Sequence, residues 1–199
     1  MMKTIIKYHS DSFKEFDWLD FDYLPNSNGY RCEISFQEIE DRVAQSIMLF
    51  NSLFKSFQPN FLIKTFGQDN EWGNFCIDTW DIENDRYDYS PANKEEPTAS
   101  YLKMLKDSNI EPTFTGFCKC IDWDSFLYII LHCIMQHKAP YSMMFYEQNE
   151  KFVFYFHHSG SIGLYYKELN EGVKKIIKSV KNEGLLIRNI NAYAGSDEQ

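Results

Sequence analysis

The sequence predicts an α+β fold, in which a mainly antiparallel sheet is packed against two long helices and a C-terminal helix. Segments with helical spacing and segments with strand character are mixed along the chain, without the regular alternation that is typical of parallel sheets. The later strands are joined by short turns, which connect antiparallel neighbours. With 199 residues, the chain is expected to form a single domain spanning residues 1–199.

The N-terminal part of the chain predicts two short strands. Residues 3–8 are expected to form an edge strand. Residues 25–29, with the sequence Pro-Asn-Ser-Asn-Gly, form a turn cluster. Residues 30–35 then predict a second strand.

The first long helix is predicted to begin at Ser35 and to end at Pro59. Ser35 and Glu38 have the spacing of a capping box, in which two side chains satisfy free backbone N–H groups. Apolar residues then recur at intervals of three and four, as one face of a helix requires. They are Ile39, Val43, Ile47, Phe50, Phe54 and Phe57.

The middle of the chain predicts a hairpin, a loop, a short helix and a strand. Residues 61–66 and 74–81 read as two strands joined by an extended polar loop. Residues 83–97 contain two prolines, several charges and no periodicity, which predicts a long exposed acidic loop. A short helix is expected from Thr98 to about Lys106, and a further strand over residues 113–121.

The C-terminal part predicts the second long helix, a meander and the last helix. Asp122 is a suitable N-cap for a helix over residues 123–138, whose near-continuous apolar character predicts burial on most sides. Gly184 stands where a helix C-cap glycine belongs. The remaining expected elements are strands at 141–146, 151–157, 162–166 and 185–190, a helix at 168–182, and a frayed tail at 194–199.

The charge of the chain is acidic and unevenly distributed. Lys and Arg number 20 against 29 for Asp and Glu, a net charge of −9. This balance disfavours nucleic acid as a direct ligand and disfavours an anionic membrane surface, because both attract basic proteins. Residues 11–22 hold five acids against Lys14, and residues 69–97 hold nine acids against Arg86 and Lys94. The fold could bring these two segments together.

The cysteines and apolar runs predict a cytoplasmic protein. The five cysteines are odd in number and scattered, which favours reduced, buried thiols. Residues 1–8 hold too few apolar residues for a signal-peptide core. The longest apolar run, residues 126–135, is shorter than the ~20 residues that a membrane span needs.

Aromatic residues interleaved with carboxylates are the strongest functional signal. The chain has 17% aromatic residues, and residues 17–23 read Asp-Trp-Leu-Asp-Phe-Asp-Tyr. Rings supply contact area and carboxylates steer approach, so the combination suits a basic protein partner. If this tract were a strand, Trp18, Asp20 and Asp22 would share one face. The candidate partner contacts are Asp17, Trp18, Asp20, Asp22, Trp72, Asp85, Tyr87 and Asp88.

No catalytic or metal motif competes with that signal, and no cofactor is expected. Cys118 and Cys120 with His132 and His137 do not have the spacing of a structural zinc site. Two alternatives remain open. The first is a metal-assisted hydrolase that uses the region of Asp78 and Asp81 with a histidine. The second is a small-ligand-binding protein whose aromatic residues line a pocket.

In size, charge and aromatic content, the whole chain resembles the small acidic α+β immunity proteins of bacterial contact-dependent and polymorphic toxin systems. No diagnostic motif accompanies the resemblance, so it assigns no residues. It implies a non-enzymatic cytosolic inhibitor that binds one cognate toxin domain, often a basic nuclease, and blocks its site.

Overall fold

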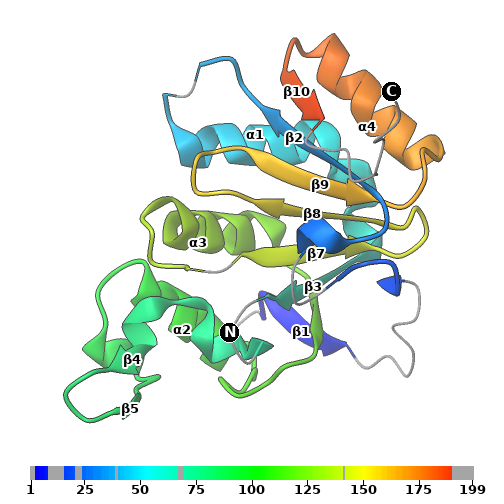
Figure 1. Cartoon of the computed structure of the whole chain (residues 1–199). Helices are drawn as coiled ribbons and strands as arrows, with labels where there is room; N and C mark the ends of the chain where they lie inside the picture. The colour runs from blue at the N-terminus through cyan, green and yellow to red at the C-terminus, as the bar shows by residue number, and fades with distance from the viewer. Residues whose placement is uncertain are drawn as a thin grey trace.

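The computed structural model describes residues 3–8, 16–20, 24–38, 40–66, 70–140 and 142–189, and it confirms the α+β fold (Figure 1). One large sheet has the strand order β1-β6-β3-β7-β8-β9-β2-β10, and every neighbouring pair is antiparallel. These strands are β1 (Ile5–Tyr8), β6 (Phe117–Cys120), β3 (Phe61–Thr65), β7 (Met143–Glu147), β8 (Phe152–Phe156), β9 (Ile162–Tyr166), β2 (Tyr30–Ser35) and β10 (Leu186–Asn189).

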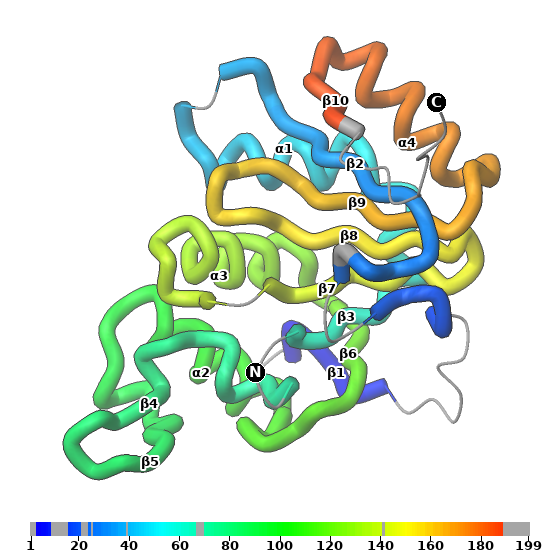
Figure 2. Tube along the Cα trace, viewed as in Figure 1, coloured from blue at the N-terminus to red at the C-terminus, as the bar shows by residue number. Residues whose placement is uncertain are grey.

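The helices and a small hairpin complete the fold. The described residues form four α-helices, which are α1 (Arg42–Leu53), α2 (Thr98–Asp107), α3 (Trp123–Met135) and α4 (Glu171–Asn182). Figure 1 shows α1 and α3 lying across one face of the sheet. Strands β4 (Trp80–Asp81) and β5 (Arg86–Tyr87) form a separate two-stranded hairpin near α2. In Figure 2, β1 and β10 lie at opposite edges of the large sheet.

Stacked phenylalanines join the helix layer to the sheet. Phe54, just after α1, stacks on Phe154 of β8 with ring centroids 4.0 Å apart and planes within 6°. Phe145 of β7 stacks beside Phe154 at 4.5 Å. Phe50 of α1 lies against Trp123 of α3 at 5.0 Å. All of these phenylalanines are fully buried, so they fix the distance between the two layers.

The opposite face of the sheet is also covered at its centre. Phe16, Trp18 and Leu19 pack there in a second apolar cluster. The strand residues beneath them are Leu62, Met144, Tyr146, Val153 and Tyr165. The central strands β7 and β8 are therefore apolar at nearly every position, instead of alternating, because both of their faces are buried.

The predicted capping box at Ser35 and Glu38 is wrong. Ser35 is the last residue of β2 and lies opposite Leu186 of β10. The helix begins later, where Asp41 caps α1 by accepting a hydrogen bond from the Ala44 N–H at 3.0 Å. After α1 the chain continues as a 3₁₀ turn over Lys55–Asn60. Pairing within the sheet thus took precedence over a local capping pattern.

The hairpin predicted between residues 61–66 and 74–81 is also wrong. Strand β3 pairs with β7 and β6 instead. Residues Trp72–Phe75 and Ile77–Thr79 form 3₁₀ turns, because their backbone N–H groups bond to neighbouring loops. Gly73 donates to the Pro112 carbonyl at 2.7 Å, and Ile77 donates to the Lys138 carbonyl at 2.8 Å.

The predictions for the C-terminal half are confirmed. Asp122 caps α3, with its carboxylate accepting from the Ser125 N–H. Strands β7, β8 and β9 form the expected meander. Helix α4 is followed by Gly184 with φ at +65°, the left-handed conformation of a C-cap glycine. The strand expected at 113–121 is shorter, as β6, and the tail at 194–199 lies outside the described residues.

All five cysteines are free, and four of them are buried. Burial raises the pKa of Cys32 and of Cys118 to about 12, because a thiolate is poorly solvated there. Among the helices that the structure describes, none is both long and apolar enough to cross a lipid bilayer.

Glu147, at the end of β7, is a fully buried carboxyl group. One of its oxygens accepts a hydrogen bond from the Glu150 N–H. The other makes no hydrogen bond of ordinary geometry within the described ranges, although the nearby Asn60 side chain offsets part of the cost of burial. Burial therefore raises the pKa of Glu147 above its ordinary value, since the charged form is incompletely stabilised.

We predict that Phe154→Ala lowers the free energy of unfolding by about 3–5 kcal/mol, because it opens a cavity inside the phenylalanine stack. Phe154→Leu should cost clearly less, since it keeps most of the buried volume. Urea unfolding with an unchanged m-value would measure both. Equal losses for the two variants would contradict a role for packing at this position.

We predict that Glu147→Gln gains stability relative to the wild type as the pH rises from 4.5 towards neutrality. The raised pKa favours the protonated form in the folded state, so the wild type loses stability as pH rises from 4.5, the ordinary value, through the folded-state pKa. Folded and unfolded pKa values that differ by one pH unit correspond to a loss of about 1.4 kcal/mol. Chemical unfolding at several pH values tests this, with the exposed Glu168→Gln as the control. A difference that does not change with pH would contradict it.

Candidate protein-binding site

Two of the predicted contact residues are buried and cannot meet a partner in this conformation. Trp72 is 0% exposed, and its Nε1–H donates to the Gly116 carbonyl at 2.9 Å. The Trp72 carbonyl accepts from the Tyr101 hydroxyl at 2.7 Å. Trp18 is 5% exposed and covers the sheet. The prediction that these rings are partner contacts is wrong, because each one completes an apolar core.

Residues 16–20, the described part of the first acidic segment, form a turn and not the strand that alternation would require. The Leu19 N–H bonds back to the Phe16 carbonyl at 3.0 Å. Asp17 is exposed, and its carboxylate lies 3.8 Å from the Lys167 ammonium. Asp20 is half-buried, and its N–H donates to the Ser27 hydroxyl. Asp22 lies outside the described residues.

The described parts of the two acidic segments do not lie together. Residues 16–20 lie against the sheet, whereas the β4–β5 hairpin lies beyond α2 at a different end of the molecule (Figures 1 and 2). Asp85, Tyr87 and Asp88 belong to the hairpin region. The hairpin is therefore a separate surface.

The hairpin carries a concentration of exposed apolar side chains. Ile77 is 49% exposed, Trp80 42%, Ile82 83% and Tyr87 38%. These four residues stand within eleven positions of the sequence. The carboxylates of Asp81, Glu83 and Asp85 lie among them along the same segment. We call these seven residues the hairpin surface.

Aromatic contacts anchor the hairpin to the body of the protein. Trp80 and Tyr87 meet edge to face with ring centroids 4.9 Å apart, and Tyr87 stacks on Tyr89 at 5.6 Å. The Tyr89 hydroxyl donates to the Asn74 side-chain oxygen at 2.8 Å. Gly73 makes room for this packing, because a Cβ there would lie 2.6 Å from the Tyr89 ring. Trp80 and Tyr87 are thus held in place by Tyr89, which is itself fixed by its hydrogen bond to Asn74.

Asp88 has a structural role in the loop. One carboxylate oxygen accepts from the Ser90 N–H at 2.9 Å, and the other accepts from the Asn93 amide at 3.0 Å. These bonds and the nearby Lys94 hold the pKa of Asp88 below its ordinary value. The Asp88 N–H donates to the Thr79 carbonyl at 2.8 Å, which closes the base of the hairpin. Its carboxylate is therefore used inside the loop.

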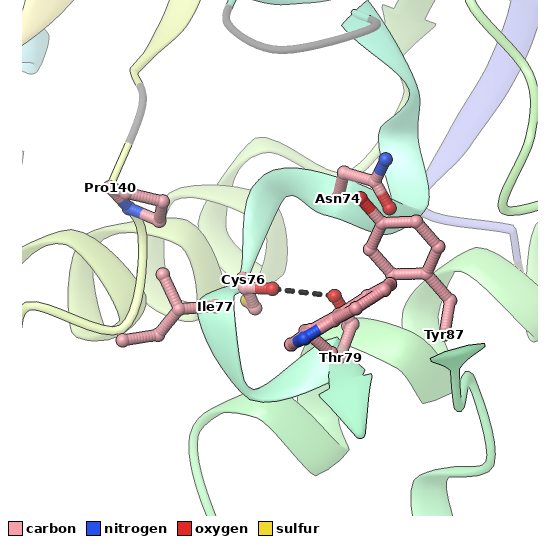
Figure 3. A pocket seen from close by; sticks show the side chains of 7 residues that line it. Asn74, Cys76, Ile77, Thr79, Tyr87 and Pro140 are labelled. Atoms are coloured by element: carbon pink, nitrogen blue, oxygen red, sulfur yellow. Dashed lines mark hydrogen bonds between the residues drawn. The ribbon is translucent and has the colours of Figure 1, made fainter. Parts of the chain in front are cut away.

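A cavity of about 470 Å³ opens beside the hairpin (Figure 3). Figure 3 shows Ile77 and Pro140 on one side of it and Asn74 and Tyr87 on the other. The Thr79 hydroxyl donates to the Cys76 carbonyl at 2.7 Å between them. The lining residues are Asn74, Cys76, Ile77, Thr79, Trp80, Tyr87 and Pro140.

The hairpin segment beside the cavity carries a net negative charge. Asp78 is neutralised by Lys138, whose ammonium lies 2.9 Å away. Asp81 bonds to the Asn84 backbone and side chain, and these bonds lower its pKa. Neither Glu83 nor Asp85 forms an ion pair with a residue in the described part of the chain. Their charge is therefore available to a partner.

Metal-binding groups and known relatives give no further guide to this site. Within the described ranges, no three His, Cys, Asp or Glu side chains are placed so that they could hold a metal ion. No protein-family model, no curated protein and no solved structure matches the chain. The geometry of the hairpin surface and its cavity is thus the observation from which a function can be proposed.

Sequence reasoning misses the apolar members of this surface. The sequence pattern places Ile77 and Ile82 in a strand or beside an exposed acidic loop and does not mark them as contacts. Trp80 flanks that loop and is a contact candidate only if its ring is exposed, so the chosen contact set leaves it out. A signal is present, since Ile82 stands alone between Asp81 and the polar triplet Glu-Asn-Asp. An isolated large apolar residue within a charged turn is not needed for the core and indicates an exposed position.

We predict that Asp85→Gly strengthens the hairpin, because Asp85 adopts a φ of +51° that glycine tolerates better. The Asp88 N–H, which closes the hairpin, should exchange with solvent about fivefold more slowly. Hydrogen exchange followed by NMR measures this. Glu83→Gly is the matched control and should speed exchange, since glycine there only adds flexibility. Faster exchange in both variants would contradict the argument.

Proposed function

We propose that this protein is a non-enzymatic cytoplasmic inhibitor that binds and neutralises a cationic protein domain through the hairpin surface. The observation that carries the proposal is the group of four exposed apolar side chains interleaved with carboxylates. Immunity proteins of bacterial toxin systems are proteins of this kind, and a cognate toxin domain, such as a basic nuclease, is the partner we propose. Direct binding of nucleic acid is not part of the proposal.

Exposed apolar clusters with a polar rim are typical of protein interfaces. Burial of Trp80, Tyr87, Ile77 and Ile82 would supply the binding energy, since apolar area contributes roughly 25 cal/mol per Å² removed from water. The surrounding carboxylates would steer a basic partner, and steered association reaches on the order of 10⁸ M⁻¹s⁻¹ at low salt. Fast association suits an inhibitor that must act before its target does.

The revised contact set differs from the one that the sequence predicts. Asp85 and Tyr87 stay in it, and Ile77, Trp80 and Ile82 join them. Asp17 and Asp20 belong to a separate acidic area beside Lys167, which is not required for the proposed interface. Trp18 and Trp72 support the fold, and Asp88 supports the loop.

Binding of a small molecule is the second candidate function. The cavity of about 470 Å³ has the size of a ligand site, and its walls are largely apolar and aromatic. A ligand that fits would raise the melting temperature in proportion to its occupancy. A thermal-shift screen of metabolite-sized compounds distinguishes this candidate, because a protein inhibitor needs no such ligand.

We predict that Glu83→Lys combined with Asp85→Asn slows association with the cognate domain about tenfold at low salt and flattens its salt dependence. Asn is chosen at position 85 because it tolerates a positive φ. The domain to test is the one encoded immediately upstream in the native locus, first by co-expression and host growth, then by stopped-flow binding. Glu38→Lys combined with Glu168→Gln changes the net charge equally at exposed positions outside the hairpin.

Two results would contradict the proposal. The first is an upstream domain that is harmless when expressed alone, or one that this protein does not neutralise. The second is an equal effect of the hairpin variant and its charge-matched control, which would show that net charge matters and that the hairpin surface does not.

A further inference from the structure

The cavity beside the hairpin combines features that recognise one type of side chain. Its apolar wall is formed by Ile77 and Pro140, and its aromatic wall by Trp80 and Tyr87. Both rings are partly exposed, so part of each ring remains open to a ligand. Figure 3 shows Tyr87 pointing towards Asn74 across one side of the cavity.

Polar groups in the lining are acceptors as well as donors. The Cys76 carbonyl already accepts from the Thr79 hydroxyl, and the Asn74 side-chain oxygen accepts from Tyr89. The Cys76 carbonyl also accepts from the Thr79 N–H at 3.3 Å, so both of its lone pairs are used, whereas the Asn74 side-chain oxygen has a second lone pair. A ligand with N–H donors could bond to the Asn74 oxygen, whereas an anion would meet its lone pair.

The charge next to the cavity also favours a cation. Asp81 lies in β4 opposite Arg86 of β5, which attracts its carboxylate. Glu83 and Asp85 follow in the turn and form no ion pair with a described residue. Arg86 is the cation that the hairpin itself carries. Asp78 is already paired with Lys138 and contributes little net charge. Glu83 and Asp85 therefore leave the hairpin beside the cavity with a net negative charge.

From these features we infer that the cavity receives an arginine side chain of the protein partner. A guanidinium stacks on aromatic faces, offers five N–H donors and is more weakly hydrated than an ammonium. The three methylene groups of the arginine side chain can pack against the apolar wall formed by Ile77 and Pro140. The inference rests on the proposed function for the identity of the partner, but the cavity's preference for arginine can be tested without it.

The test uses N-acetyl-arginine amide as the probe, with N-acetyl-lysine amide and N-acetyl-norleucine amide as comparisons. The indole N–H signal of Trp80 in a ¹H–¹⁵N NMR spectrum reports occupancy and is identified by its loss in Trp80→Phe. We expect saturable shifts with arginine, and roughly fivefold tighter binding than that of lysine. The norleucine probe should bind more weakly than both, because it carries no charge.

Trp80→Leu keeps an apolar wall and removes the ring, so it should abolish the preference for arginine over lysine. Because Trp80 is 42% exposed, the variant should fold, and unchanged indole signals of Trp18, Trp72 and Trp123 would verify this. Norleucine binding as tight as arginine, or arginine shifts that do not saturate, would overturn the inference. So would an arginine preference that survives in Trp80→Leu.

The inference and the proposed function fail in different ways. If the hairpin charge variant weakens binding of the cognate domain but arginine amide does not bind, the inhibitor proposal stands and the inference is overturned. If arginine amide binds selectively but the upstream domain is not neutralised, the inference stands and the proposed function fails. In the complex, changing one arginine of the partner to lysine should weaken binding to the wild-type protein. The same change should weaken binding to the Trp80→Leu variant only slightly.

Discussion

The fold depends on a sheet whose central strands are buried on both faces. Phe145 and Phe154 point to the helix layer, where Phe54 stacks against them. Met144 and Val153 point to the other side, where Phe16 and Trp18 cover them. A sheet of this kind is stable only if both covering layers are in place, since exposure of either face would leave a large apolar area in water. Loss of either covering layer would therefore expose one face of the central strands to water.

The hairpin surface depends indirectly on the sheet and its covering layers. Residues 72–79 have no strand partner, and their backbone bonds go to the loop before β6 and to the segment after α3. The buried side chain of Trp72 bonds to Gly116 in the same loop. The framework of α2, α3 and the sheet edge therefore positions Trp80 and Tyr87. A short hairpin with two paired residues in each strand has little stability of its own, and here it is supported from its base.

Elements whose signals are local and strong can be predicted from the sequence. Helix α3 is one, because its cap at Asp122 and its apolar run agree, and the meander is another, because apolar runs alternate with turn residues. The prediction fails where a long-range contact overrides a local pattern. Ser35 has the spacing of a capping box but is held in β2 by its pairing with β10. Residues 74–81 have a strand-like composition, but most of them form 3₁₀ turns because no strand of the large sheet pairs with them.

The site is predictable only in part, through Asp85 and Tyr87. The sequence pattern misassigns Trp18 and Trp72, because rings interleaved with carboxylates do not reveal which rings are covered by the rest of the chain. The apolar members of the hairpin surface become visible only when the burial of each side chain is known. Burial is set by contacts between distant segments, which a local pattern does not contain.

The strand order has a consequence for how the chain reaches this structure. Strand β2 is made early, but its two neighbours in the sheet are β9 and β10, and Tyr30 lies opposite Tyr166. At the usual rate of synthesis of about 5–20 residues per second, β2 waits on the order of ten seconds for a partner. During that interval its backbone N–H and C=O groups stay open to pairing with other chains. Completion of the sheet is thus a late event, because β2 gains its neighbours only after β9 and β10 have been made.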